Sequence, residues 1–523
     1  MSTLPIQLNG PKELQTRFLY PFFFQRQKVK EACDALREVT HAGKNGTTLT
    51  VWENAQPHAL YQEELLKHVV QFLFRNPNTL GCGYFRLAGP VASRWFNKLV
   101  ARLPEGTTIP VSHVTPVLVE LFLSSYGVGV LSLALTPKFQ SLTLKGASNF
   151  NYRLSQLHHG TAAQLYIPHP SEDKERWDKL PQETKDQVGV PPKPDAPLGE
   201  RLGRPGGAFI LRELIDELLH PLEAKNLELQ RAQQQLSVYT AALFNDDVDF
   251  EQPEVCRTLG PFLSNLSQIE ESAHAGAPAN NVGVTNAILN RRHWAGVGLL
   301  GAAHLIADQS PPDDHFNSER MPRIMLKYFV PYLVALLQRI ALHRINHEAS
   351  GIVISRQKPS NIDVVELRGQ LLEFAVDGHF TEVSYREAIH RYYRLSQEGL
   401  NVRSALDDAR RAISDIDAQN IIQRQVNLAE ELGRNVKATI DIQKDMTKQL
   451  QIVAGIQMKV EWIEIFIVGF YTAELMHIIV SLFEKEYHFE LWWSTLLVLG
   501  GGLIAGLIAW RKINPSEHKG SSH

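Results

Sequence analysis

The chain has little cysteine, and its charges are nearly balanced. Its 523 residues include only three cysteines, Cys33, Cys82 and Cys256, and no CxxC pair. The sequence therefore indicates neither a disulfide framework nor a zinc site, and a reducing compartment is expected. Lysines and arginines number 53 and acids 56, giving a net charge of −3 at pH 7. Without a basic stripe, we expect no nucleic-acid partner.

The common catalytic motifs are also missing. The sequence contains no GxxxxGK[ST], GxSxG or HExxH, which removes the usual phosphate-binding, hydrolase and metalloprotease sites. Gly296, Gly298 and Gly301 spell GxGxxG, but a dinucleotide site needs a strand before this motif and a helix after it. The surroundings read as helical or loop-like, so we expect no such site, no cofactor and no enzyme activity. A membrane-tethered enzyme would need a cytosolic cleft that collects histidines and carboxylates, which the sequence leaves scattered.

Long apolar runs are lacking before residue 460 and appear only near the C-terminal end. Leu491–Trp510 is uncharged, and Val460–Phe483 is nearly as apolar. About twenty helical residues match a hydrocarbon core of about 30 Å. We therefore predict two transmembrane helices, 460–483 and 491–510, that anchor a large aqueous body.

The flanking charges predict the orientation of these helices. Lys444, Lys448 and Lys459 precede the first, and Arg511 and Lys512 follow the second. Positive charge near span ends is retained on the cytoplasmic side, so both termini, including the tail 511–523, should be cytoplasmic. The N-terminus has no signal-peptide pattern, and the outer loop 484–490 is acidic.

The rest of the chain predicts an α+β cytosolic domain followed by a helical region. Residues 1–167 mix strand and helix patterns, and Val117–Leu135 reads as a hairpin with its turn at Ser124–Gly127. Residues 168–207 are rich in proline and charge and read as a linker or surface excursion. Residues 208–395 read as a helical domain, in which 221–244 is expected to be helical.

Two local features of the helical region carry further predictions. Met321–Ile345 resembles a span, but charged residues interrupt it, so we expect a buried core helix kinked at Pro331. Ser384 and Glu387 have the spacing of a capping box at the start of the next long element.

Residues 396–459 are predicted to form a stalk helix, with a break near Gly399. A packed or coiled-coil seam is indicated by alternating four-and-three spacing of Val402, Leu406, Ala409, Ile413 and Ile416. After Asn420 the seam continues at a spacing of four with Leu428, Leu432, Val436 and Ile440. Such a stalk needs partners, either a helix of the same chain or copies of itself. It would transmit cytoplasmic movement to the membrane or act as a stiff spacer.

The first span carries a polar face. The face is formed by Glu464, Tyr471, Glu474, His477 and Ser481. At 100° per residue, these five side chains fall within an arc of about 140° around the helix. Ionisable groups at membrane depth usually face a bundle interior or a wet path. In the alternative interpretation, Glu461 and Glu464 lie at the membrane interface beside Trp462. Glu474 and His477 then form hydrogen bonds inside the bundle or lie near the outer surface.

Two further features would act in an oligomer. Glu484, Glu486 and Glu490 of the outer loop would form acidic rings that concentrate cations at a mouth. In the second span Gly502 and Gly506 form a GxxxG motif, which favours close helix packing.

This layout resembles the CorA-like superfamily of magnesium transporters, with a cytosolic α/β domain, a long stalk, two spans and a basic end. Lys459–Ile463 and the strand Tyr126–Leu131 are similar to segments of uncharacterised two-span proteins with that layout. The resemblance implies a pentamer in the bacterial inner membrane. CorA transporters carry Gly-Met-Asn at the outer end of the first span, whereas this chain has Val480–Glu484 there, so magnesium selectivity is not carried over.

Two functions follow as expectations. In the first, the protein is a homo-oligomer in the lipid membrane that moves or gates divalent cations. The divalent cation is either the transported ion or a regulatory ion. In the second, the protein is a membrane-anchored scaffold or sensor whose cytosolic domain binds a protein partner.

Overall fold

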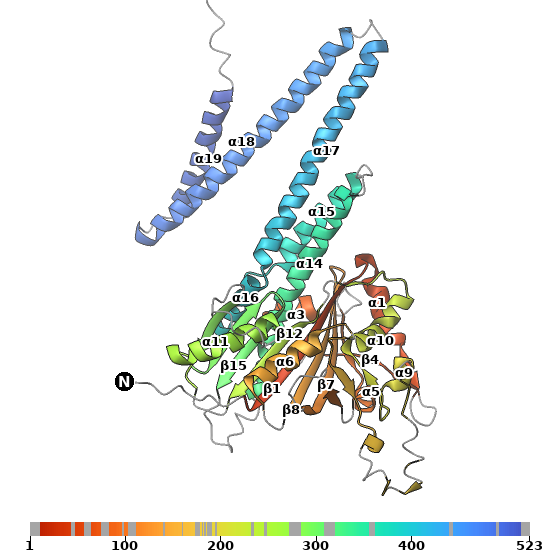
Figure 1. Ribbon diagram of the computed structural model, residues 1–523. Helices are drawn as coiled ribbons and strands as arrows, with labels where there is room; N and C mark the ends of the chain where they lie inside the picture. The colour runs from red at the N-terminus through yellow and green to blue at the C-terminus, as the bar shows by residue number, and fades with distance from the viewer. Residues whose placement is uncertain are drawn as a thin grey trace, which may run out of the picture. The chain divides into compact units, whose positions relative to one another are not determined.

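The computed structural model divides into two compact units, 1–419 and 420–523 (Figure 1). It describes residues 11–42, 48–56, 64–74, 83–96, 99–102, 111–139, 142–158, 160–172, 178–179, 181–182, 185, 191–193, 196–231, 235–244, 248–270, 284–307, 320–354, 361–438, 443–487 and 491–513.

A mixed ten-stranded sheet forms the centre of the first unit. Its strands run in the order β13 (Val284–Asn290), β14 (His293–Gly298), β15 (Gly301–Ala307), β12 (Ser237–Phe244), β1 (Glu13–Phe23), β8 (Val128–Phe139), β7 (Val111–Ser124), β5 (Gly83–Leu87) and β4 (Trp52–Asn54), and β11 (Gln230–Arg231) also pairs with β1. β12 and β15 are parallel, and the other described pairs are antiparallel. Smaller sheets join β10 (Ala208–Phe209), β9 (Gln164–Tyr166) and β6 (Val100–Arg102), and β2 (Thr40–Ala42) with β3 (Thr48–Thr50).

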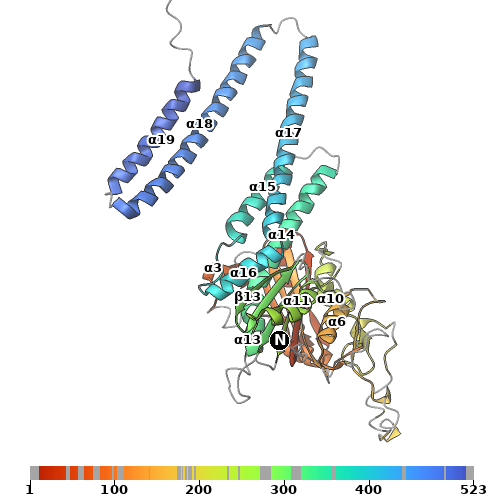
Figure 2. The ribbon, with the colours of Figure 1, turned by 60° about the vertical axis from the view of Figure 1, so that its left-hand side comes forward.

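Helices cover both faces of this sheet (Figures 1 and 2). One hydrophobic core contains residues of α1 (Val29–Glu38), α5 (Gly89–Trp95), α6 (Leu144–Ser155), α9 (Leu198–Arg201), α10 (Leu211–Ala224) and α11 (Pro253–Gln268). The other contains residues of α3 (Lys67–Phe74), α13 (Arg320–Lys327), α14 (Phe329–Ile354) and α16 (Glu387–Gly399). Successive side chains of a strand enter opposite cores, so the central strands are buried on both faces.

The predicted hairpin is confirmed. β7 and β8 pair antiparallel around a turn in which the amide of Gly127 donates to the Ser124 carbonyl at 3.0 Å. Gly127 has φ +67, and a Cβ there would collide with the Arg344 guanidinium and approach the Phe24 carbonyl to 2.6 Å. Glycine is therefore required at this turn by both backbone conformation and space.

The predicted helical domain 208–395 is wrong in its middle part. Residues 237–244 and 284–307 form β12 to β15 of the central sheet, and the expected helix 221–244 ends at Ala224. All eight residues of β12 are buried. A short apolar run that is buried on both faces lacks the alternation of apolar and polar residues that distinguishes a strand from a helix. This is why β12 was predicted as part of a helix.

The proline-rich segment 168–207 lies inside the first unit and so does not link two domains. Its described part around α9 is anchored by Arg201, which is buried. The Arg201 Nε donates to the Ala196 carbonyl at 2.8 Å, and its Nη2 contacts Glu213 of α10 at 2.6 Å. A surface excursion that packs against α10 describes this segment better than a linker.

The apolar segment around Pro331 is confirmed as a core helix. Ile324–Gly351 is long and apolar enough to cross a membrane, but 83% of its most apolar window is buried inside the first unit. The expected kink is instead a break between α13 and α14 at Tyr328. Pro331 then lies in the first turn of α14, where a missing amide hydrogen leaves no helical bond unmade.

The elements after α14 differ from the expected stalk in two ways. α15 (Asn361–Glu373) and the π-helical turn η5 (Phe374–Gly378) precede α16, whose start lacks the expected capping box. The buried Ser384 hydroxyl donates to the Glu64 carbonyl at 2.5 Å, which secures the chain to the segment before α3. The break near Gly399 is present, but the structure describes two further helices, α17 (Val402–Ala438) and α18 (Gln443–Tyr487), rather than one.

The start of α17 has its partners within the same chain. The five seam residues Val402, Leu406, Ala409, Ile413 and Ile416 are all buried in the core that contains α14. The first half of the predicted seam is therefore packed in the first unit by helices of the same chain. In the second half Leu428 is 58% exposed, and the side chains of Leu432, Val436 and Ile440 lie outside the described residues.

The second unit contains both segments that the sequence predicts to span a membrane, and both are helical. α18 carries the apolar segment Ile452–Ile479, of which none of the most apolar window is buried, and α19 (Leu491–Ile513) contains the shorter apolar stretch Val498–Ile508. An exposed helix of this length and composition is suited to a membrane. The expected outer loop 484–490 is shorter than predicted, because α18 continues to Tyr487 and residues 488–490 lie outside the described part.

Replacing Gly127 with Ala should destabilise the first unit by about 1–3 kcal/mol, because alanine resists a positive φ and its Cβ would displace Arg344. Urea denaturation of the purified protein measures this change. Gly89→Ala is the matched control, since nothing lies within 4 Å of its added Cβ. Equal stability of both variants would contradict the assigned role of Gly127.

Candidate functional site

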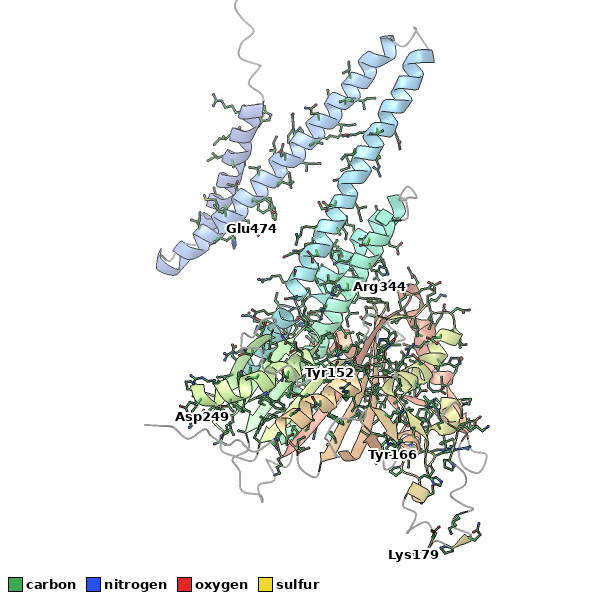
Figure 3. The ribbon with its side chains drawn as sticks, viewed as in Figure 1. Tyr152, Tyr166, Lys179, Asp249, Arg344 and Glu474 are labelled. Carbon is green, nitrogen blue, oxygen red and sulfur yellow. The ribbon has the colours of Figure 1, made fainter. Side chains whose placement is uncertain are left out.

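The polar face predicted on the first span lies on α18. Glu464, Tyr471, Glu474 and His477 are all exposed, and Figure 3 labels Glu474. The structure gives Ser481, Glu484 and Glu486 as backbone positions within α18, and Glu490 lies outside the described residues. The structure therefore places Glu484 and Glu486 in a helix, and the acidic mouth itself stays a prediction.

α19 packs against another side of α18. A Cβ on Gly501 would lie 3.2 Å from the Met476 Cε, and one on Gly502 would lie 3.9 Å from the Ala473 Cβ. At 100° per residue, the centre of the polar face lies about 140° around α18 from the Ala473–Met476 contact line. Glu474 is therefore not enclosed between the two helices of one chain.

The GxxxG motif contributes only in part to this contact. A Cβ on Gly502 would meet α18, whereas a Cβ on Gly506 would meet nothing within 4 Å. Gly501, which lies outside the motif, makes the closest approach. Gly501 and Gly502 therefore set the helix contact, as small residues do in membrane helix pairs.

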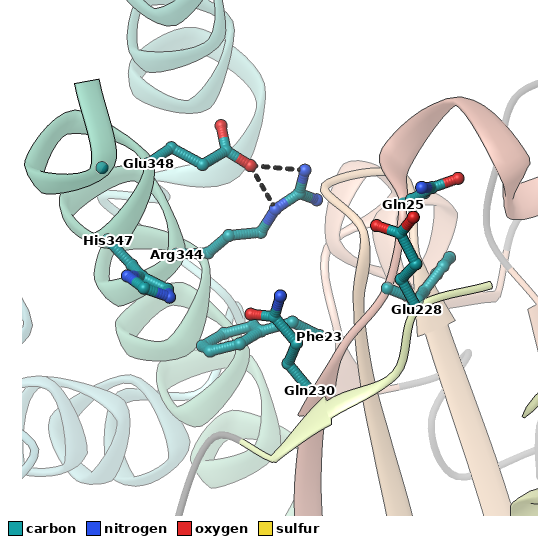
Figure 4. Close-up of a pocket in the computed structure, with 9 residues that line it drawn as sticks. Phe23, Gln25, Glu228, Gln230, Arg344, His347 and Glu348 are labelled. Atoms are coloured by element: carbon teal, nitrogen blue, oxygen red, sulfur yellow. Dashed lines mark hydrogen bonds and ion pairs between the residues drawn. The ribbon is translucent and has the colours of Figure 1, made fainter. Parts of the chain in front are cut away.

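A second candidate site is a cavity of about 310 Å³ in the first unit (Figure 4). Its volume is at the lower end of the range of about 300–1,000 Å³ for ligand pockets. Figure 4 shows one wall formed by α14 and the facing wall by Gln25 and Glu228. The lining residues are Phe23, Phe24, Gln25, Glu228, Gln230, Arg344, His347, Glu348 and Gly351.

Arg344 is held in place at the edge of this cavity. Its Nε donates to Glu348 Oε1 at 2.8 Å, its Nη2 lies 2.7 Å from the same oxygen, and its Nη1 donates to the Tyr126 carbonyl. The guanidinium therefore connects α14 to the β7–β8 turn. Sequence reasoning missed this site, because its residues come from segments more than 100 positions apart and share no motif.

A buried chain of polar rings lies on the α14 side of the sheet. The His293 Nε2 and His304 Nδ1 are 2.8 Å apart, and the His304 Nε2 lies 3.0 Å from the Tyr392 hydroxyl. Both histidines are buried, and the Tyr239 and Tyr328 rings also face His304. Burial, with a contribution from His293, holds the pKa of His304 well below its ordinary value. His304 is thus neutral at physiological pH and serves packing and hydrogen bonding.

The same side of the sheet contains a buried ion pair. Arg17 of β1 pairs with Glu120 of β7, and Tyr84 of β5 donates its hydroxyl proton to the same carboxylate. Burial alone would raise the pKa of Glu120, but the charge of Arg17 and these hydrogen bonds hold it below its ordinary value. The Arg17 guanidinium lies 4.2 Å from the centre of the Phe329 ring, so the pair also contacts α14.

The GxGxxG sequence has a structural explanation. Contrary to the expected helix or loop, Gly296 and Gly298 lie in β14, and Gly301 begins β15. A Cβ on Gly296 would lie 2.9 Å from the Leu263 side chain, and one on Gly298 would lie 2.9 Å from the Ser267 carbonyl. The glycines therefore allow α11 to pack closely on a hairpin, and no helix follows the motif as a dinucleotide site requires.

Among the residues that the structure describes, no group of three or more His, Cys, Asp or Glu side chains could hold a metal ion. No protein-family model matches the chain, and no curated protein matches it.

Replacing His304 with Gln should reduce the loss of stability at low pH. Below pH 6.5 the unfolded chain binds a proton at His304 that the folded protein does not, so stability falls as the pH drops, by up to about 1.4 kcal/mol per unit. Urea denaturation between pH 7.5 and 5.5 should show a flatter dependence for His304→Gln. An exposed-histidine variant, His347→Gln, is the control, and a wild-type slope in His304→Gln would refute the assignment.

Proposed function

We propose that the protein is an integral membrane homo-oligomer of CorA-like architecture that moves or gates divalent cations. In this proposal α18 and α19 span the bacterial inner membrane with both termini cytoplasmic. The positive residues before α18 and after α19 support that orientation. Selectivity for magnesium is not part of the proposal, because the chain lacks Gly-Met-Asn.

The observation that carries the proposal is the direction of the polar face of α18. Glu464, Tyr471, Glu474 and His477 are exposed, and α19 contacts α18 along Ala473 and Met476 instead. In a bilayer such groups would face lipid, where a charged side chain costs at least about 2.5 kcal/mol. Contact with the same face of other copies removes that cost and encloses a polar axis.

The axis would give each group a role. Glu474, in the apolar part of α18, would replace water around a passing cation, and Glu484 and Glu486 near the end of α18 would concentrate cations at the mouth. Five copies are expected if the likeness to CorA extends to assembly.

The second candidate function is a membrane-anchored scaffold or sensor. It is favoured by exposed apolar residues on and after α15: Val365 is 70% exposed, Leu372 66%, Val376 71% and Tyr385 84%. The first three have the i, i+7, i+11 spacing of one helix face. Exposed apolar groups that gather on one face are typical of a surface that binds another protein.

Native mass spectrometry of the detergent-purified protein should give the mass of a pentamer. A ring is required because the polar face of α18 needs neighbours on both sides to form an enclosed axis. A monomer or dimer would leave no ring and would favour the scaffold or sensor, and partner capture with the cytosolic domain would follow.

Replacing Glu474 with Gln should lower divalent-cation flux into proteoliposomes by about tenfold, which corresponds to about 1.4 kcal/mol at the barrier. Glu461→Gln is the matched control, because it makes the same chemical change on α18 outside the polar face. Native mass spectrometry must show an unchanged assembly. Equal flux through wild type and Glu474→Gln would remove Glu474 from the conduction path.

A further inference from the structure

The cavity in the first unit contains carboxylate and amide groups with unused hydrogen-bonding capacity. Arg344 contacts only one oxygen of Glu348, Oε1. Oε2 of Glu348 and the side chains of Glu228, Gln25 and Gln230 make no hydrogen bond or ion pair with the described residues. Carboxylates therefore face the cavity from both walls, Glu348 from α14 and Glu228 from the facing wall (Figure 4).

The charge of the cavity favours a cation. Its lining has two carboxylates against one guanidinium, and Arg344 already neutralises much of Glu348. Gly351 lies in the last turn of α14, which ends at Ile354, and the carbonyl end of a helix attracts positive charge. An anion would meet Glu228 and find Arg344 already bound, so anionic ligands are disfavoured.

The remaining lining groups favour an organic cation over a metal ion. The described residues offer no group of three ligands for a metal, and the cavity is larger than a single ion needs. The Phe23 ring at the bottom of the cavity would pack against methylene groups or the face of an ammonium group. The amide oxygens of Gln25 and Gln230 can accept further hydrogen bonds from an ammonium group.

We propose that this cavity binds an aliphatic diamine or polyamine. One ammonium group pairs with Glu228, a second pairs with the free Oε2 of Glu348, and the chain between them lies over Phe23. The ligand thereby joins α14 to the end of β1 and to β11. This site is independent of cation movement along α18, and the two proposals can fail separately.

Isothermal titration calorimetry with spermidine tests the site on the full-length protein in detergent. Wild type should bind spermidine saturably, and Glu228→Gln should weaken binding by about tenfold, because a charge-assisted hydrogen bond is lost. Glu223→Gln is the matched control, since it removes the same charge from an exposed position on α10 outside the cavity. Its affinity should equal that of wild type.

A monoamine tests whether binding needs more than one ammonium group. Butylamine should bind at least about tenfold more weakly than spermidine, because it can reach only one carboxylate. Glu228 is exposed, so the fold should survive its replacement, and thermal unfolding without ligand checks this point. Equal spermidine affinity in wild type and Glu228→Gln, or an absence of saturable binding to wild type, would overturn the proposal.

Discussion

The central sheet is covered on both faces, and a polar side chain within it must therefore find its partner inside the protein. Burying a charge without a partner is expensive, and an isolated half of a buried ion pair destabilises a protein by about 3–5 kcal/mol. The pair Arg17–Glu120, with the Tyr84 hydroxyl, meets this requirement across β1, β7 and β5. The His293–His304–Tyr392 chain meets it at β14, β15 and α16. The first contact also touches α14 through Phe329, and the second joins α16 to the sheet.

α14 is the element that connects the core to the candidate ligand site. Its N-terminal half is buried against the sheet, where Phe329 lies under Arg17, and its C-terminal half presents Arg344 and Glu348 to the cavity. Arg344 also holds the β7–β8 turn through the Tyr126 carbonyl. A ligand that bound Glu348 would therefore contact a residue of α14 that pairs with Arg344, and Arg344 in turn holds the β7–β8 turn.

Local patterns predicted the apolar elements that a turn or interrupting charges mark, and they failed where a short buried run carries no such mark. The hairpin around Gly127 was predictable from two apolar runs and a turn, and the core helix at 329–354 from its short uninterrupted apolar stretch. β12 was mistaken for helix because all of its residues are buried. Ser384 has capping-box spacing, yet its hydroxyl bonds to Glu64, a partner 320 positions away that no local pattern contains. The cavity escaped prediction for the same reason, since its walls meet only after folding.

The sequence by itself determined that two long apolar segments end the chain and that one of them carries a polar face, because both properties depend on length and on the helical repeat alone. It also determined the α+β character of the first unit. Only the tertiary structure decided that a single sheet includes 237–244 and 284–307, that Gly501 and Gly502 form the helix contact, and that Glu474 lies away from α19. Those outcomes depend on which surfaces pack together, and packing between distant segments is set by shape and pairing that a local pattern does not encode.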